Sequence, residues 1–361
     1  MFRVAIDTTP MRLGGGGVAT YTRELLAAYE ASSEVEVVPI AHDQTGASSS
    51  IGRIAAGIDR ESRFYPRGLA RAAQAAEADL IHVPAAMPAY STSLPLVLTI
   101  HDAIPWRHPE WFTRANAIQQ RLLVGRAARR ADLVLTGSQD SKSDIIEHLR
   151  IPKDRITVVQ NGRSPAFSPD LRDPQWLARR FGITGPVVLS VGTPEPRKNL
   201  TGTLSTFARV SRELPEATLL LVGGGGWLSN DLDQQIAACP GRVVRTGHID
   251  FAELTRTYAS ADCFLFPSLL EGFGLPPLEA MASGLPVVCS DRPSLPEVVG
   301  DAAITAPPND HQTLANAVLE VLTNETVTGD MRARGLAQAA QFSWARSASE
   351  TVAAYRTVLG R

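Results

Sequence analysis

The chain has 361 residues, 44% of them apolar, a length and composition that suit two packed domains rather than one. Its formal net charge of −2 lacks the basic excess of nucleic-acid-binding proteins, so no nucleic acid partner is expected. The three cysteines, Cys239, Cys263 and Cys289, follow no metal or disulfide spacing, and no apolar run reaches transmembrane length.

These features also predict where the protein works. Widely separated cysteines of this kind are typical of reduced core residues in a cytosolic protein. The chain runs from Met1 straight into an apolar strand, which leaves no room for a signal peptide. We expect a cytoplasmic protein whose contact with a membrane, at its inner face, would be peripheral.

Short apolar runs alternate with amphipathic stretches through the first half of the chain. The predicted strands are Arg3–Asp7, Val35–Ile40, Leu80–Val83, Leu96–His101, Leu133–Thr136 and Ile156–Val159. Helical patterns lie between most of them, the clearest being Tyr21–Ala31, Ala115–Arg130 and Ser141–Leu149. This alternation predicts a parallel sheet covered by helices on both faces.

Four glycines, Gly14 to Gly17, precede the first long helix. They can be scored as a G-x-G-x-x-A dinucleotide fingerprint, but they start several residues after the strand ends. The next strand also offers no acidic partner at the expected distance, since Asp43 lies late. A glycine loop over a cleft fits better, and a plain flexible loop is the alternative.

His101 and Asp102 stand at the carboxyl end of a predicted strand, where α/β folds place residues that contact ligands. A lone histidine can equally be structural. Asp102 either orients His101 or contacts substrate hydroxyls, and the sequence leaves both roles open.

A basic run on the helix Arg114–Arg130 has two interpretations. Its arginines share the helix with Leu122, Leu123 and Val124 and are Arg114, Arg121, Arg126, Arg129 and Arg130. We interpret them as a solvated helix face. The alternative is docking on anionic lipid, which would suit a lipid-linked acceptor.

The strand–helix pattern restarts after an irregular, proline-rich stretch, Gly162–Pro174, which we interpret as a linker. The predicted strands are Val187–Val191, Thr218–Val222, Val243–Thr246, Cys263–Phe266 and Val287–Cys289, and the predicted helices are Leu200–Leu214, Ala252–Tyr258 and His311–Leu322. Two doubly wound, Rossmann-like α/β domains facing across a ligand-binding cleft are therefore expected.

Two adjacent cations, Arg197 and Lys198, follow the strand Val187–Val191 and open a helix. They suit a diphosphate, because fixed cations stabilise the negative charge that builds up when a nucleoside diphosphate departs. A solvated Arg-Lys pair is the alternative. That alternative is weakened because cations at a helix N-terminus are unfavourable without an anion partner.

The most informative stretch is Pro267–Met281, a glycine-rich turn between a strand and a helix. Its free backbone N–H groups and the positive end of the helix dipole suit an anion. Glu271 in the loop and Glu279 in the helix can hold hydroxyls while the amides of the turn face phosphate. An ordinary turn with two solvated glutamates is the alternative.

The pair Glu271 and Glu279, eight positions apart around Gly-Phe-Gly-Leu-Pro, resembles the signature of retaining glycosyltransferase family 4. The stretch Pro296–Gly300 fits the same family, and the resemblance covers nearly the whole chain. It implies the GT-B fold. An acceptor-side domain over residues 1–165 would precede a nucleotide-sugar donor domain over 166–342, and the last helix, 345–361, would pack back on the first domain.

The resemblance also implies roles for single residues. Glu279 would hold the donor ribose, Glu271 would touch the transferred sugar, and His101 would face that sugar. Many members carry Arg directly after the glycine of the strand, where this chain has Thr193, and we assign that role to Arg197. The expected catalytic group is His101, Asp102, Arg197, Lys198 and Glu271. The remaining contacts implied by the resemblance would come from Gly16, Gly17, Gly272, Phe273, Gly274 and Leu275. Separately, His248 and Ile249 follow a predicted strand and can offer backbone groups to the base.

No metal or cofactor is expected. Asp231-Leu232-Asp233 spells the D-x-D of metal-dependent sugar transferases, but no strand end directs both carboxylates at a diphosphate. The predicted function is metal-independent, retaining transfer of a hexosyl group from a nucleotide-diphosphate sugar to a glycan, lipid-linked or small-molecule acceptor.

Two other functions stay open from the sequence. One is a nucleotide-sugar 2-epimerase or hydrolase of similar fold, and the other is a non-catalytic nucleotide-sugar-binding subunit. The stretch Pro194–Asn199 resembles mannosyl- and rhamnosyltransferases of surface polysaccharides, which favours mannose or rhamnose as the sugar.

Overall fold

The computed structural model describes residues 1–13, 16–32, 34–43, 56–85, 87, 92–224 and 229–360. The chain divides into two compact units. The first comprises residues 1–162 with the returning segment 343–361, and the second comprises residues 163–342. The sequence places this boundary after residue 165, and the structure places it three residues earlier, after Gly162.

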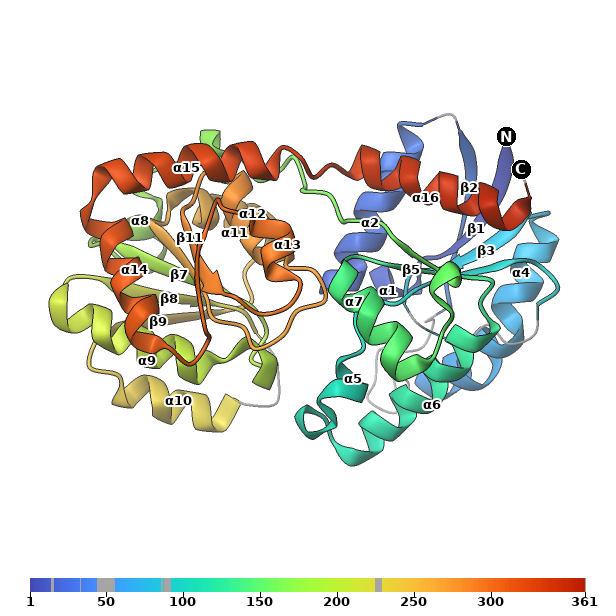
Figure 1. Ribbon diagram of the computed structural model, residues 1–361, viewed down its shortest axis with the longest axis horizontal. Coiled ribbons are helices and arrows are strands. Elements are labelled where there is room, and N and C mark those ends of the chain that lie inside the picture. Colours follow the sequence, from blue (N-terminus) through green and yellow to red (C-terminus); the bar gives the residue numbers. More distant parts are fainter. Residues whose placement is uncertain are drawn as a thin grey trace. The chain divides into compact units, whose positions relative to one another are not determined.

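The first unit is built on a sheet of six parallel strands in the order β2-β1-β3-β4-β5-β6. Figure 1 labels β1, β2, β3 and β5 of this sheet. The strands are β1 (Phe2–Asp7), β2 (Val35–Ile40), β3 (Leu80–Val83), β4 (Leu96–Thr99), β5 (Leu133–Thr136) and β6 (Ile156–Val158). All lie within two residues of the predicted strands. β4 ends at Thr99 rather than His101, because the chain turns there toward a short proline-initiated helix, α5 (Ile104–Arg107).

Helices cover both faces of this sheet. They include α1 (Thr9–Arg12), α2 (Gly17–Glu30), α4 (Leu69–Ala75), α6 (Arg114–Arg130), α7 (Gln139–Asp144) and α16 (Trp344–Leu359). Alternate residues of a strand face opposite sides. In β4, Leu96 and Leu98 pack with α4 and α6, whereas Val97 packs with α2 and α16.

Helix α16 belongs to the first unit although it ends the chain. The Ser343 hydroxyl caps it by accepting from the amide of Arg346 at 3.2 Å. Gly162 lies against the same backbone, where a Cβ would stand 2.1 Å from the Trp344 nitrogen, so only glycine fits. The Trp344 ring meets Tyr21 of α2 edge-on, with centroids 5.8 Å apart. The chain passes from one unit to the other after Gly162 and again before Ser343. These two points are adjacent, and Trp344 packs against Tyr21 of α2 beside them.

The second unit has a six-stranded parallel sheet in the order β12-β11-β10-β7-β8-β9. Its strands are β7 (Val187–Val191), β8 (Thr218–Val222), β9 (Arg242–Gly247), β10 (Cys263–Phe266), β11 (Val287–Ser290) and β12 (Ile304–Ala306). The sequence missed β12, an edge strand of three residues that is too short to show a period.

The helices of the second unit again form two layers. They are α8 (Trp176–Phe181), α9 (Leu200–Glu213), α10 (Ser229–Ala238), α11 (Phe251–Ser260), α12 (Leu275–Ala282), α13 (Leu295–Val299), α14 (His311–Thr323) and α15 (Glu325–Ala339). In β10, Phe264 and Phe266 join the core beneath α11 to α13, and Cys263 and Leu265 join the core beneath α9 and α14. No helix within the described ranges combines the length and apolar character needed to cross a bilayer.

Candidate active site

The candidate site of the second unit lies where the strand order of its sheet reverses. β7 and β10 are neighbours, with β8 and β9 on one side of them and β11 and β12 on the other. Ligands of such sheets bind outside the carboxyl ends of the strands at this switch point. The segments that leave β7 and β10 there carry Arg197, Lys198 and Glu271.

Hydrogen bonds join these two segments. The amide of Leu269 and the hydroxyl of Ser268 both donate to the carbonyl of Arg197, at 2.7 and 2.8 Å. The Asn199 side chain donates to the carbonyl of Pro267 at 3.0 Å. The turn before α9 is therefore held against the loop after β10.

The local sequence explains the shape of that turn. Pro196 opens a single 3₁₀ turn, Pro196–Lys198, because its fixed φ suits a first helical position. Asn199 follows with a φ of 51°, in the left-handed region that Asn tolerates. Its side-chain oxygen accepts from the Gly202 amide at 3.2 Å and caps α9.

Glu271 stands at the centre of a charged cluster. Its Oε1 accepts from Lys198 Nζ at 2.7 Å and from the Ser268 hydroxyl at 2.6 Å, and its Oε2 accepts from Arg197 Nη1 at 2.6 Å. Arg197 Nε also donates to Glu195 at 2.8 Å. The Glu271 and Lys198 side chains are only 7% and 8% exposed, so the cluster is buried and its charges are paired.

The electrostatics of the cluster keep Glu271 ionised. Burial alone would raise the pKa of Glu271, but the charges of Arg197 and Lys198 outweigh burial and hold it below its usual value. Burial lowers the pKa of Lys198, and the charge of Glu271 opposes that change. Lys198 Nζ also lies 4.7 Å from the centroid of the Phe266 ring, a cation–π contact.

The turn from Gly272 to Leu275 leads into α12. Gly274 caps that helix with a φ of 116°, and a Cβ there would stand 2.8 Å from the Leu295 side chain, so glycine is required. Phe273 is buried and meets the Phe342 ring edge-on at 6.0 Å. Of Phe273, therefore, only the backbone can face a ligand.

Glu279 lies apart from the charged cluster, on α12, beside Tyr258. Burial, together with the neighbouring charge of Glu279, raises the pKa of Tyr258 well above its usual value. The Glu279 side chain is half-buried. The two glutamates of the motif thus differ in their surroundings: one is ion-paired, and the other lies next to an aromatic hydroxyl.

The His101 and Asp102 pair belongs to the first unit. His101 Nε2 lies 2.9 Å from the carbonyl of Pro84, which follows β3, and its ring meets Tyr21 edge-on at 4.9 Å. Burial lowers the pKa of His101, while the charge of Asp102 opposes that change. The Asp102 carboxylate accepts from the Ile104 amide at 3.1 Å and so supports the start of α5.

The predicted glycine loop is a helix start in the structure. Gly16 caps α2 with a φ of 126°, and Gly17 is already the first helical residue, which corrects the loop assignment for both. Gly14 and Gly15 lie outside the described residues. A cavity of about 380 Å³ borders Gly16 and Gly17, with Arg60 and Tyr65 on its wall.

Three weaker candidates are placed as follows. Ile249 is 7% exposed and its side chain packs in the core, so only its backbone groups, the ones predicted to meet the base, can face a ligand. His248 beside it is exposed. In the D-x-D stretch, Asp233 forms an ion pair with Arg245 at 2.6 Å.

Sequence reasoning missed two contributors to the cluster. Ser268 is fully buried, and its signal was only a small residue directly after Pro267. Glu195 stands between two prolines, and nothing in that pattern indicated its contact with Arg197. Within the described residues, no group of three or more His, Cys, Asp or Glu side chains is arranged to hold a metal.

Comparison with known proteins adds the family context. The chain matches a model described as Glycosyltransferase Family 4 over residues 15–167 and one described as Glycosyl transferases group 1 over residues 185–324. It is 31% identical to the O-antigen chain mannosyltransferase B of Escherichia coli, over 98% of this chain and 99% of the relative. It is also 33% identical to the glycogen synthase of Mycobacterium tuberculosis, over 76% and 66% of the two chains.

Solved structures resemble the whole chain. The sucrose-phosphate synthase of Thermosynechococcus elongatus gives a TM-score of 0.76 with 21% identity over 100% of both chains. The Anabaena protein Alr3699/HepE in complex with UDP-glucose gives 0.75 with 21% identity over 99% and 100%. At such identities the likeness concerns the fold. It confirms the predicted class, two Rossmann-like α/β domains of the GT-B type.

Proposed function

Because the chain belongs to glycosyltransferase family 4, we propose that it moves a hexosyl group from a nucleotide-diphosphate sugar to a glycan, lipid-linked or small-molecule acceptor. Mannose is favoured over rhamnose, since relatives named O-antigen chain mannosyltransferase B and serotype-specific mannosyltransferase WbdA match the chain. The Anabaena neighbour in complex with UDP-glucose supports a nucleoside diphosphate as the carrier.

The observation that carries this proposal is the buried cluster of Arg197, Lys198 and Glu271 at the switch point of the second sheet. Pairing with Glu271 uses one of the three N–H donors of the Lys198 ammonium. The other donors of this ammonium, together with the charge of Arg197 beside it, can bind a diphosphate and stabilise the charge that develops as it leaves. No divalent cation is needed for that role.

The surroundings of Glu271 favour one chemical route to a product that keeps the donor configuration. Double displacement needs a carboxylate nucleophile below the anomeric carbon. Both oxygens of Glu271 already accept hydrogen bonds, from Lys198, Ser268 and Arg197, and its pKa is lowered, so it is a poor nucleophile. We therefore favour front-face attack, in which the departing diphosphate accepts the acceptor proton.

His101 has a defined part in this scheme. The Pro84 carbonyl can only accept, so the 2.9 Å contact requires the hydrogen of His101 on Nε2. With its pKa lowered by burial, the ring is neutral, and Nδ1 is an acceptor. A neutral acceptor of that kind suits a hydroxyl of the transferred sugar. Asp102, held by the Ile104 amide, would support this position rather than attack the sugar.

The experiment is a donor screen followed by product analysis. Purified protein is incubated with GDP-mannose, dTDP-rhamnose and UDP-glucose, with and without EDTA, and release of nucleoside diphosphate is measured. We expect release with a mannose donor, unchanged by chelator. Loss with EDTA that Mg²⁺ or Mn²⁺ restores would contradict the metal-free scheme.

The stereochemistry is tested on the product and on the enzyme. Proton NMR of the new linkage should report the anomeric configuration of the donor, and an inverted anomer would refute retention. A slow fluorinated donor should leave the intact mass of the protein unchanged. A stable adduct on Glu271 or Asp102 would refute front-face attack.

A further inference from the structure

The second unit has a cavity at the edge of its sheet opposite the charged cluster. Its volume is about 840 Å³, and its lining includes Val187, the first residue of β7, and Asp262, which directly precedes β10. The charged cluster follows the last residues of the same two strands. A five-residue strand spans roughly 15 Å, so a ligand in this cavity would not occupy the donor site.

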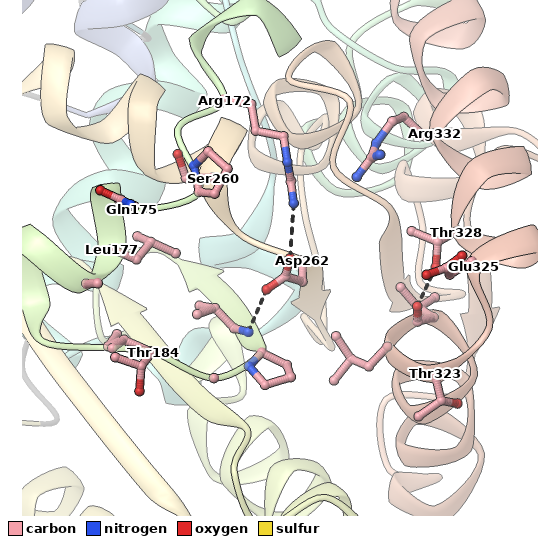
Figure 2. A pocket seen from close by; sticks show the side chains of 18 of the residues that line it. Arg172, Gln175, Leu177, Thr184, Ser260, Asp262, Thr323, Glu325, Thr328 and Arg332 are labelled. Atoms are coloured by element: carbon pink, nitrogen blue, oxygen red, sulfur yellow. Dashed lines mark hydrogen bonds and ion pairs between the residues drawn. The ribbon is translucent and has the colours of Figure 1, made fainter.

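Two arginines reach this cavity from separate elements (Figure 2). Arg172, which lies before α8, donates to the carbonyls of Ala259 and Ala261 at 3.4 and 3.3 Å and contacts Asp262 at 3.4 Å. Arg332, on α15, donates through Nε to the carbonyl of Gly284 at 2.8 Å. Backbone carbonyls therefore hold both guanidinium groups in place.

The hydrogen-bonding capacity of these guanidinium groups is only partly used. Among the residues that the structure describes, Arg332 has a partner for Nε and none for Nη1 or Nη2. Asp262 divides its carboxylate, since one oxygen accepts from the Val187 amide at 2.9 Å and the other contacts Arg172. The donors left over on Arg332 form the planar fork that phosphate binds best.

The charges of the cavity also favour an anion. Burial and the like charge of Arg172 lower the pKa of Arg332, and the charge of Asp262 opposes that change without cancelling it, so an anion between the two arginines would relieve the remaining repulsion. The cavity has a second acid, Glu325, which is exposed in the first turn of α15. Glu325 and Arg332 are seven positions apart on α15, about 10 Å along the axis, so solvent screens the charge of Glu325 from the arginine.

We propose that this cavity binds the phosphate group of a small molecule, with the phosphate between Arg172 and Arg332. The volume is far larger than one phosphate needs, so the ligand is a phosphate ester with a polar body. Gln175, Thr184 and Ser260 on the wall supply the amide and hydroxyl groups that sugar hydroxyls need (Figure 2). The proposal does not depend on the identity of the donor or acceptor of the enzyme.

The test is calorimetric titration with inorganic phosphate, glucose 6-phosphate and glucose. We expect saturable binding of both phosphates, tighter for the ester, and none of glucose. Affinity should fall at least tenfold in Arg332→Gln and in Arg172→Gln, and less in Arg332→Lys, which keeps the charge but loses the fork. Thermal melting checks that each variant is folded.

Two controls keep this site distinct from the donor site. Arg334→Gln changes an exposed arginine on the same helix that contacts Asp330 instead, and it should bind like wild type. Lys198→Ala disables the proposed diphosphate clamp and should also keep phosphate-ester binding. The proposal is overturned if wild type shows no saturable binding, or if binding is lost in Lys198→Ala but survives in Arg332→Gln.

Discussion

The two units present similar parallel sheets but opposite chemistry at their carboxyl edges. In the second unit, the site is built from full charges, with Glu271 held between Arg197 and Lys198. In the first unit, the buried polar groups that lead to Tyr21, beside His101, are hydroxyls and the His82 imidazole, while the Asp102 carboxylate next to His101 accepts from the Ile104 amide. Both arrangements satisfy buried polar atoms, one through ion pairs and the other through a chain of uncharged hydrogen bonds.

That chain runs through the core of the first unit, from Tyr29 of α2 through α16, β3 and β4 back to Tyr21 of α2. The Tyr29 hydroxyl donates to the Tyr355 hydroxyl at 3.1 Å, and Tyr355 lies 2.6 Å from His82 Nδ1. His82 Nε2 lies 2.8 Å from the Thr99 hydroxyl, which lies 3.3 Å from the Tyr21 hydroxyl. A neutral His82 has one acceptor and one donor nitrogen, so the hydrogens from Tyr29 to Thr99 point in one direction along the chain. In the last contact either hydroxyl, Thr99 or Tyr21, can donate.

The difference follows from what each edge would bind. A departing diphosphate carries negative charge, and fixed cations in a buried site lower the free energy of the transition state in which that charge develops. A sugar hydroxyl needs a neutral, well-oriented acceptor, and the Tyr21 ring at the end of the chain packs against the His101 ring. The candidate site of the second unit lies at the switch point of its sheet, whereas His101 follows β4, one strand beyond the β1–β3 reversal of the first sheet. The residues after each strand decide the chemistry of the edge where it ends.

Removing one cation of the second unit should have the largest effect. Lys198→Ala and Arg197→Ala should each lower turnover about a hundredfold or more, the scale of losing one preorganised electrostatic group. Initial rates with the best donor measure this, and circular dichroism checks folding. Lys153→Ala, which removes a lysine far from the cluster in sequence, is the control. Near wild-type turnover in folded variants of both residues would show that the cluster is structural.

The neutral chain of the first unit should appear in the pH dependence of stability. Burial, and secondarily the charge of His101, lowers the pKa of His82 from 6.5 to about 3. Below pH 6.5 the His82 side chain binds a proton in the unfolded chain but stays neutral in the folded protein. The free energy of unfolding therefore decreases as the pH falls from 6.5 toward 3. Between pH 6.5 and pH 5, His82 should lower the free energy of unfolding by about 2 kcal/mol, and the His82→Gln variant should not show this decrease.

Urea unfolding of wild type and His82→Gln at several pH values measures the difference. Burial raises the pKa of Asp7 and so gives a contribution of opposite sign, which is common to both proteins and cancels. The lowered pKa of Glu271 gives stability that is present above its usual value of 4.5 and is lost as the pH falls through the folded pKa. Parallel pH profiles for the two proteins would contradict this prediction.

Periodicity predicted most of this fold because buried parallel strands read as continuous apolar runs between amphipathic helices. Strands such as Leu80–Val83 and Leu133–Thr136 coincide with the prediction. The edge strand Ile304–Ala306 was not predicted because it is too short to show a pattern. Gly16 and Gly17 were predicted as a loop because glycine is unfavourable in helix interiors. Caps and first turns follow other rules, which one sequence shows weakly.

The residues of the candidate site could be predicted from the sequence, but the contacts between them could not. Arg197, Lys198 and Glu271 were each singled out, but the ion pairs join positions 73 and 74 residues apart, and no local pattern reports such a contact. The same holds for Ser268, which matters only because the two loops meet. Ile249 was placed in the site through its backbone, from its position after a strand, and the sequence did not show that its side chain packs in the core.

Two glycines with positive φ compare backbone strain in the two regions. Gly16 and Gly274 have φ of 126° and 116°, so alanine at either position is strained by roughly 1–2 kcal/mol. Beyond Gly16 there is open space, whereas a Cβ on Gly274 would meet Leu295 at 2.8 Å. Gly274→Ala should therefore lower the free energy of unfolding by about 1 kcal/mol more than Gly16→Ala. Chemical denaturation measures both, and equal losses would mean that Leu295 moves aside freely.

The smallest expected effect concerns the outer surface of α6 in the first unit. Ile118 and Leu122, one helical turn apart, are each 59% exposed, and Arg126 continues the same stripe as an exposed residue. Arg121 is not part of this stripe, because its guanidinium donates to the carbonyls of Pro105 and Trp106. An exposed apolar pair with adjacent cations suits the surface of an anionic bilayer.

We therefore propose that α6 contacts anionic lipid. In co-sedimentation with phosphatidylglycerol vesicles, Ile118→Ser with Leu122→Ser should weaken binding several-fold, because two partly exposed apolar side chains contribute little more than 1 kcal/mol together. Phe251→Ser, which removes a 45% exposed aromatic from the second unit, is the matched control and should bind like wild type. If wild type does not bind the vesicles, or if the double variant binds them equally well, α6 is a solvated face that makes no contact with lipid. The outer surface of the first unit would then not differ from that of the second unit in lipid binding.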